Sequence, residues 1–123
     1  MKPLVLVVCA AAGLVAGCGS GTTPVAFCND FQTALCARMF DCTTADVQST
    51  SDFQTSWGTS VGDCDAKLEA SNCATATNDR PCATATMTFH PDKADACVAD
   101  LKAAACSTVL GGFTSDNCSA VCS

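Results

Sequence analysis

The residues of this chain that could do the most varied chemistry are its cysteines, twelve among 123 residues. A thiolate can attack a substrate, bind a metal or oxidise with a second cysteine, and spacing helps to separate these uses. Zinc sites and thiol–disulfide enzymes use close pairs such as C-x2-C, and the sequence contains no such pair. The closest pairs are Cys118 with Cys122 and Cys36 with Cys42. We therefore expect disulfides, no metal site and no cofactor.

The first seventeen residues have the composition of a secretory signal. Met1 and Lys2 form a short positive region, residues 4–15 are apolar apart from a glycine and Cys9, and two small residues follow. Such a segment is too short to span a bilayer as a stable helix. We expect residues 1–17 to be a signal peptide that is cleaved on export.

The stretch Val15-Ala16-Gly17-Cys18 resembles the lipobox of bacterial lipoproteins, with Val15 where leucine is commoner. The resemblance implies that the Cys18 thiol is diacylated with fatty chains such as palmitate and that the signal is cut before it. The new amino terminus is usually acylated as well, which makes membrane attachment durable. It therefore implies a lipid-anchored protein of the cell envelope. Gly19 stands where aspartate favours the inner membrane, so in a two-membrane cell we expect the outer one.

Counting the cysteines favours lipidation over the alternative of an ordinary signal peptide, cut after Ala16 or Gly17. Loss of Cys9 with the signal leaves eleven cysteines, and an odd number leaves one thiol unpaired in an oxidising compartment. Lipidation of Cys18 leaves ten, which can all pair in a combination that the sequence does not determine. The expected disulfide cysteines are Cys28, Cys36, Cys42, Cys64, Cys73, Cys82, Cys97, Cys106, Cys118 and Cys122.

The composition of residues 18–123 explains why crosslinks would be needed. This part has only sixteen leucine, valine and phenylalanine residues and no isoleucine, so its core is thin. Disulfides that restrict the unfolded chain would compensate, at about 2–4 kcal/mol each. Its twelve acidic residues against five lysines and arginines, with no basic cluster, argue against a nucleic-acid partner and against docking on anionic lipid headgroups.

The apolar pattern predicts a mostly all-α fold, a small disulfide-rich helical array in one domain, residues 25–123, behind a tether at 18–24. A helix is expected from Thr23 and Pro24 onward, with one stripe formed by Phe27, Phe31, Leu35 and Met39. Cys28 and Cys36 would lie about 12 Å apart along it, so each must bond to another segment.

Further helices are expected at residues 52–57 within a loop, at 61–70, from Pro91 onward, and in the last turns, with Cys118 and Cys122 on one side. Residues 74–88 are expected to be a connection, with a possible short strand near 84–89. The expected buried face of the helix after Pro91 is Ala94, Cys97, Val98, Leu101, Ala104 and Ala105.

Two cysteine–leucine–cysteine patterns share one spacing, Cys64-x3-Leu68-x4-Cys73 and Cys97-x3-Leu101-x4-Cys106, which suggests a duplicated unit. The overall layout is similar to small cysteine-rich lipoproteins of high-GC bacteria, a resemblance that implies no activity.

Two other motifs resemble known functional sites but lack the flanking residues that such sites need. His90-Pro91-Asp92 resembles the loop of J-domain co-chaperones, but the preceding residues 83–88 contain no lysine or arginine. We interpret Pro91 as a helix start, Phe89 as a packing staple and His90 as an exposed residue near the cap. Asp63, Asp65 and Glu69 lack the glycine turn of a calcium loop, so we interpret them as a solvated acidic face.

We expect no catalytic residues, because the chain has one histidine, no tyrosine and no nucleophile motif. The sequence thus favours a non-enzymatic binding or structural module, held to the membrane by lipid and facing an unidentified protein or envelope partner. Two alternatives stay open: a small inhibitor or toxin-like effector, and a hydrolase or redox enzyme without a recognisable motif.

Overall fold

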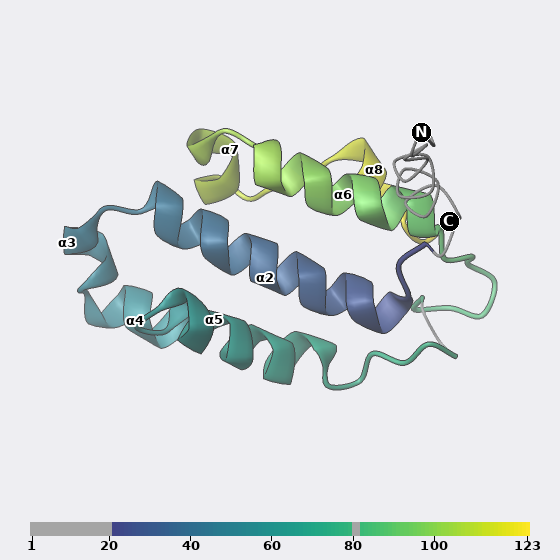
Figure 1. The fold of residues 1–123 in the computed structure, drawn as a ribbon, viewed down its shortest axis with the longest axis horizontal. Helices are drawn as coiled ribbons and strands as arrows, with labels where there is room; N and C mark the ends of the chain where they lie inside the picture. Colours follow the sequence, from purple (N-terminus) through teal and green to yellow (C-terminus); the bar gives the residue numbers. More distant parts are fainter. Residues whose placement is uncertain (1–20, 80–81) are drawn as a thin grey trace, which may run out of the picture.

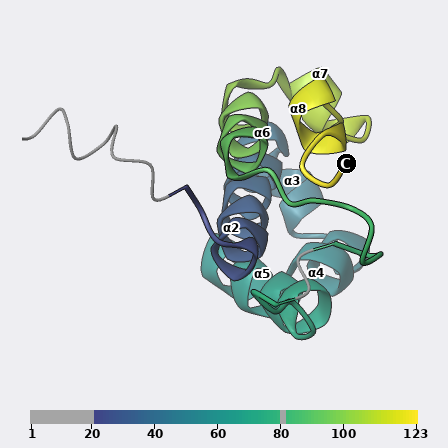
Figure 2. The same cartoon turned by 90° about the vertical axis from the view of Figure 1, so that its right-hand side faces the viewer.

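Helix α2 (Pro24–Cys42) runs through the middle of the fold, between α6 (Pro91–Ala103) on one side and α5 (Val61–Leu68) on the other (Figures 1 and 2). The structure, a computed structural model, describes residues 21–79 and 82–123. The expected signal peptide at 1–17 and Cys18 lie outside the described residues. The remaining elements are α3 (Ala45–Gln48), α4 (Ser51–Trp57), a π-helical turn η1 (Glu69–Cys73), α7 (Cys106–Leu110) and α8 (Asp116–Ser119). The prediction of a mostly helical, disulfide-rich fold is confirmed.

Side chains satisfy the free backbone groups at both ends of α2. Thr23 accepts a hydrogen bond from the Ala26 amide at 3.2 Å, and Pro24 occupies the first helical position, as the sequence predicts. Asn78, from the connection after η1, accepts from the Val25 amide. At the other end Gln48 donates from Nε2 to the carbonyl oxygens of two residues in or just after the last turn. The helix ends are thereby fixed to the segments that surround them.

Helix α5 and η1 lie antiparallel to α2. The sequence predicts one helix over residues 61–70; the α-helix ends at Leu68, and the chain continues as the π-helical turn to Cys73. Ser60 caps α5 by accepting from the Asp63 amide at 3.1 Å. The preceding loop, predicted to hold one short helix, holds α4 and also α3.

Helix α6 runs parallel to α2, because the connection from residue 74 to residue 90 returns the chain to the end where α2 begins (Figure 1). Four residues of its predicted buried face are buried: Ala94, Cys97, Val98 and Leu101. Ala104 is half-buried, but Ala105 is exposed because the helix has already ended at Ala103. The suggested duplication is not reflected in the topology, since α5 and α6 run in opposite directions along α2.

The sequence allows a short strand near residues 84–89, but the structure has no continuous strand there. Residues 84–87 form a turn, in which the Met87 amide donates to the Thr84 carbonyl. Within residues 84–89, the backbone pairs at Thr88 and Phe89, and Phe89 forms an isolated antiparallel bridge with Cys122. The sequence predicts that Cys118 and Cys122 lie on one side of a last helix. The helix formed there, α8, ends before Cys122, so the two cysteines do not share a helix face. The bridge holds the end of the chain against the start of α6.

The core consists of two small clusters on the α6 side of α2. One is built on Ala34, Met39, Val98, Leu101 and Val109, and the other on Ala94, Cys97 and Val121. Phe27 and Phe31 from the predicted stripe pack against both clusters and so join them. On the opposite side of α2, the buried contact with α5 is the disulfide between Cys36 and Cys64, both fully buried.

Removing different disulfides should therefore cost different amounts of stability. Cys36–Cys64 and Cys82–Cys122 close loops of similar length, with sequence separations of 28 and 40. Loop entropy alone predicts nearly equal effects, but only the first pair is fully buried. We expect the double variant Cys36→Ala/Cys64→Ala to lose about 4–5 kcal/mol in denaturant unfolding, and Cys82→Ala/Cys122→Ala about 2–4 kcal/mol. An equal or larger loss in the second variant would contradict the assigned role of α2–α5 packing.

Candidate functional site: the disulfide framework and an apolar cleft

The ten cysteines expected to form disulfides do so in five pairs. The sequence could not supply the pairing, but its one constraint is confirmed: Cys28 and Cys36 bond to different segments. The Cα–Cα distances of the five pairs lie between 4.6 and 5.8 Å. The pairs are Cys28–Cys73, Cys36–Cys64, Cys42–Cys106, Cys82–Cys122 and Cys97–Cys118.

Two of these disulfides border an apolar cleft beside the first half of α2. The cleft has a volume of about 370 Å³, within the range of small-ligand sites. Phe27 and Phe31 form its α2 wall, and residues 76–77 of the connection after η1 form the opposite edge. The Cys97–Cys118 disulfide closes it on the α6 side. None of the residues that line this cleft carries a charge.

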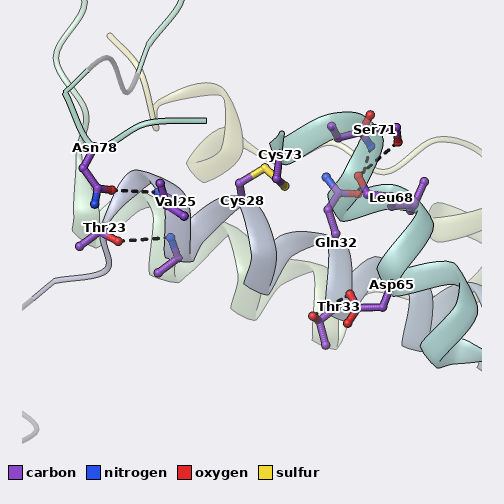
Figure 3. Close-up of a disulfide and its surroundings, with 12 residues drawn as sticks. Thr23, Val25, Cys28, Gln32, Thr33, Asp65, Leu68, Ser71, Cys73 and Asn78 are labelled. Carbon is purple, nitrogen blue, oxygen red and sulfur yellow. Dashed lines mark hydrogen bonds between the residues drawn. A yellow bond between two sulfur atoms is a disulfide. The ribbon is translucent and has the colours of Figure 1, made fainter. Parts of the chain in front are cut away.

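The walls of the cleft are held in place by interactions from three segments. The rings of Phe27 and Phe31 lie 6.0 Å apart, and Phe89 packs on Phe27 at 6.2 Å. Figure 3 shows the Cys28–Cys73 disulfide joining α2 to η1, beside the hydrogen bond from the Val25 amide to Asn78. Covalent and hydrogen-bonded attachment of the connection keeps the cleft from collapsing onto α2.

One polar side chain contributes to the lining. Gln32 is only 8 % exposed, and its Oε1 accepts a hydrogen bond from Asn72 Nδ2 at 3.3 Å (Figure 3). An apolar cleft with one amide in its wall suits a small, mainly hydrophobic ligand that makes at most a few polar contacts. The sequence did not single out Gln32 or residues 76–77, because they match no motif and only the fold brings residues 76–77 beside α2.

The residues of the other sequence motifs make contacts within the fold, at helix ends and between helices. His90 is the residue before the first turn of α6, as predicted, but it is half-buried, and its Nε2 shares a hydrogen bond with Ser123 Oγ at 3.1 Å. Phe89 packs against the cluster that contains Ala94, which agrees with its interpretation as a staple. Asp63 accepts from the Thr59 amide at 2.8 Å, and Asp65 accepts from the Thr33 hydroxyl at 2.9 Å.

Within residues 21–79 and 82–123, no group of three or more histidine, cysteine, aspartate or glutamate side chains is placed to hold a metal ion. In the same part of the chain no helix combines the length and the apolar character needed to cross a membrane. No protein-family model, curated protein or solved structure matches the chain.

An acidic side chain fastens α8 beside the cleft. Asp100 Oδ2 accepts a hydrogen bond from Asn117 Nδ2 at 3.0 Å, and this bond, followed by one from Ser115, lowers the pKa of the Asp100 carboxyl below its ordinary value. A lowered folded-state pKa means that the ionised form stabilises the fold above the unfolded pKa. That contribution is lost as the pH falls through the folded value.

Removing the amide partner should therefore raise the pKa of Asp100. In Asn117→Ala we expect the pKa of the Asp100 carboxyl, followed by NMR titration, to move up toward its ordinary value, because the largest source of stabilisation of the carboxylate is gone. Asn72→Ala removes an amide whose partner is Gln32 and serves as the control, with no change expected at Asp100. An unchanged titration of Asp100 in Asn117→Ala would show that this hydrogen bond does not hold α8 in solution.

Proposed function

We propose that this chain is a lipid-anchored protein of the cell envelope whose disulfide-crosslinked domain is a non-enzymatic binding module for a small apolar ligand. The observation that carries the binding role is the uncharged cleft walled by Phe27 and Phe31. The cleft is preformed, because disulfides and aromatic packing hold its walls. Binding a ligand would therefore cost little conformational entropy of the protein.

The cysteine pairing supports the anchor. The ten cysteines from Cys28 onward bond to one another, so none of them is available as a disulfide partner for Cys18. An acylated Cys18 would lie six residues before Pro24, which lines the cleft. Six residues reach roughly 20 Å at full extension. The anchor would therefore keep the cleft near the membrane surface, where apolar molecules are most concentrated.

The crosslinks suit a protein exposed to the medium outside the cytoplasm. In the described part of the chain the two core clusters are small, so restricting the unfolded state contributes much of the stability, and disulfides do this in an oxidising compartment without further burial. An inhibitor or toxin-like effector would benefit from the same framework and is the runner-up. The Ser123–His90 hydrogen bond holds the end of the chain against α6 and so has a structural role.

The anchor is tested by intact mass spectrometry of the protein extracted from membranes of the expressing cell. We expect a mass lacking residues 1–17, increased by diacylglycerol and an amino-terminal acyl chain, and reduced by two hydrogens for each of the five disulfides. In Cys18→Ser the acyl mass should disappear and the protein should leave the membrane fraction. A wild-type mass equal to that of the bare polypeptide would refute the anchor.

The cleft is tested with N-phenyl-1-naphthylamine, a neutral apolar fluorophore whose emission rises in apolar surroundings. Ala76 lines the cleft, and Ala76→Trp places an indole there, so we expect at least about tenfold weaker binding of the dye. Ala85→Trp adds the same side chain to an exposed position of the same connection and should leave the affinity unchanged. Equal dye affinity in the wild type and Ala76→Trp would rule out the cleft as the binding site.

A further inference from the structure

A second apolar concavity lies at the opposite end of α2, where α3 and α7 meet its last turn (Figure 1). This distal groove, about 320 Å³ in volume, is lined by Met39, Cys42, Thr43, Thr44, Val47, Phe53 and Leu110. The Cys42–Cys106 disulfide fixes α7 beside α2, and Leu110 of α7 lines the same groove as Val47 of α3. At 1.5 Å per residue, the 19 residues of α2 place the groove about 28 Å from the end that leads to Cys18.

The distal groove carries much of the exposed apolar surface of the described chain. Val47 is 48 % exposed and Leu110 is 51 % exposed, and they are two of the four large apolar residues at the surface of residues 21–79 and 82–123. The other two, Val61 and Met87, do not line the groove. Two exposed apolar side chains on either side of a concavity form a surface suited to protein contact.

Acidic residues outnumber basic ones in the segments around the distal groove. Residues 39–66 contain five aspartates and no lysine or arginine, and residues 103–123 contain one aspartate and no basic residue. Asp46, next to Val47, is exposed. Two basic side chains reach the elements around the groove. Arg38 donates to the Ala104 carbonyl oxygen at 2.6 Å and lies 3.7 Å from Asp41, and Lys67 donates to the Thr55 carbonyl oxygen on α4. A partner must therefore present apolar side chains together with positive charge.

We propose that the distal groove binds a cationic amphipathic segment of a partner protein. Apolar side chains of the segment fill the groove between Val47 and Leu110, and its lysines or arginines face Asp46 and the other carboxylates of this end. A second copy of the chain is a poor occupant, because each copy has a formal net charge of −6 and presents the same acidic surface. Only the orientation of the groove, away from the membrane, rests on the proposed anchor; its chemistry does not.

The test uses the full-length protein in phosphatidylcholine nanodiscs and a synthetic helical peptide of leucine and lysine that carries one photo-reactive leucine. Empty nanodiscs correct for peptide bound to lipid. We expect saturable crosslinking that maps by mass spectrometry to α3 and α7, and at least about tenfold lower affinity in Val47→Ser/Leu110→Ser. Both side chains are exposed, so this variant should fold, and an unchanged far-ultraviolet circular dichroism spectrum and denaturation midpoint verify it.

The controls separate apolar and charge recognition. Val61→Ser removes an exposed valine outside the groove and should bind the peptide as the wild type does. A leucine–glutamate peptide should not bind, and Asp46→Asn should weaken the lysine peptide. Equal binding of the glutamate peptide, crosslinks away from α3 and α7, or self-association that is lost in Val47→Ser/Leu110→Ser would each overturn the proposal. The cleft and the anchor are tested by separate measurements. Failure of peptide binding at the distal groove therefore does not affect the proposed function, and failure of the cleft or the anchor does not affect the proposal for the groove.

Discussion

The covalent attachment of α2 to its neighbours is the constraint on which the rest of the structure depends. Three of the five disulfides begin on this helix, at Cys28, Cys36 and Cys42. The first two join it to η1 and α5, and the third joins it to α7. Both core clusters also pack against α2, through Phe27 and Phe31. Helix α5 is bonded to α2 by the Cys36–Cys64 disulfide, whereas α6 is held on the other side of α2 by apolar packing and is bonded to α8 through Cys97–Cys118.

The π-helical turn is explained by the register of these bonds. Eight residues separate Cys28 from Cys36 on α2, whereas nine separate their partners, Cys64 and Cys73, on the antiparallel segment. In two straight α-helices this difference would move one cysteine pair about 1.5 Å out of register. A π-helical turn accommodates an additional residue within the turn, so η1 brings Cys73 back opposite Cys28. The local departure from α-helix thus allows the Cys28–Cys73 crosslink to form.

The sequence predicted what depends on local pattern and failed where distant segments decide. Thr23 and Pro24 marked the start of α2, because capping is encoded within a few residues. The predicted apolar stripe was right only in part. Met39 is buried, but Phe27, Phe31 and Leu35 are half-buried, and the other buried residues of α2 are Gln32, Ala34 and Cys36. The π-turn after Leu68 and the early end of α6 before Ala105 depend on where partner cysteines lie in space. Gln32 became a cleft residue only because the Cys28–Cys73 bond brings the connection after η1 beside it.

Because the fold is crosslinked, its exposed apolar side chains need an explanation other than a lack of room in the core. Residues 18–123 contain only four leucines and six valines, and a domain held by packing alone would need nearly all of them inside. Here the disulfides supply part of the stability, so the core does not require Val47 and Leu110. Exposure of these apolar side chains to water is nevertheless unfavourable. They lie on either side of one concavity instead of being scattered. Such a grouping of exposed apolar side chains is typical of a contact surface. Burial of these side chains by a partner would contribute hydrophobic free energy to binding.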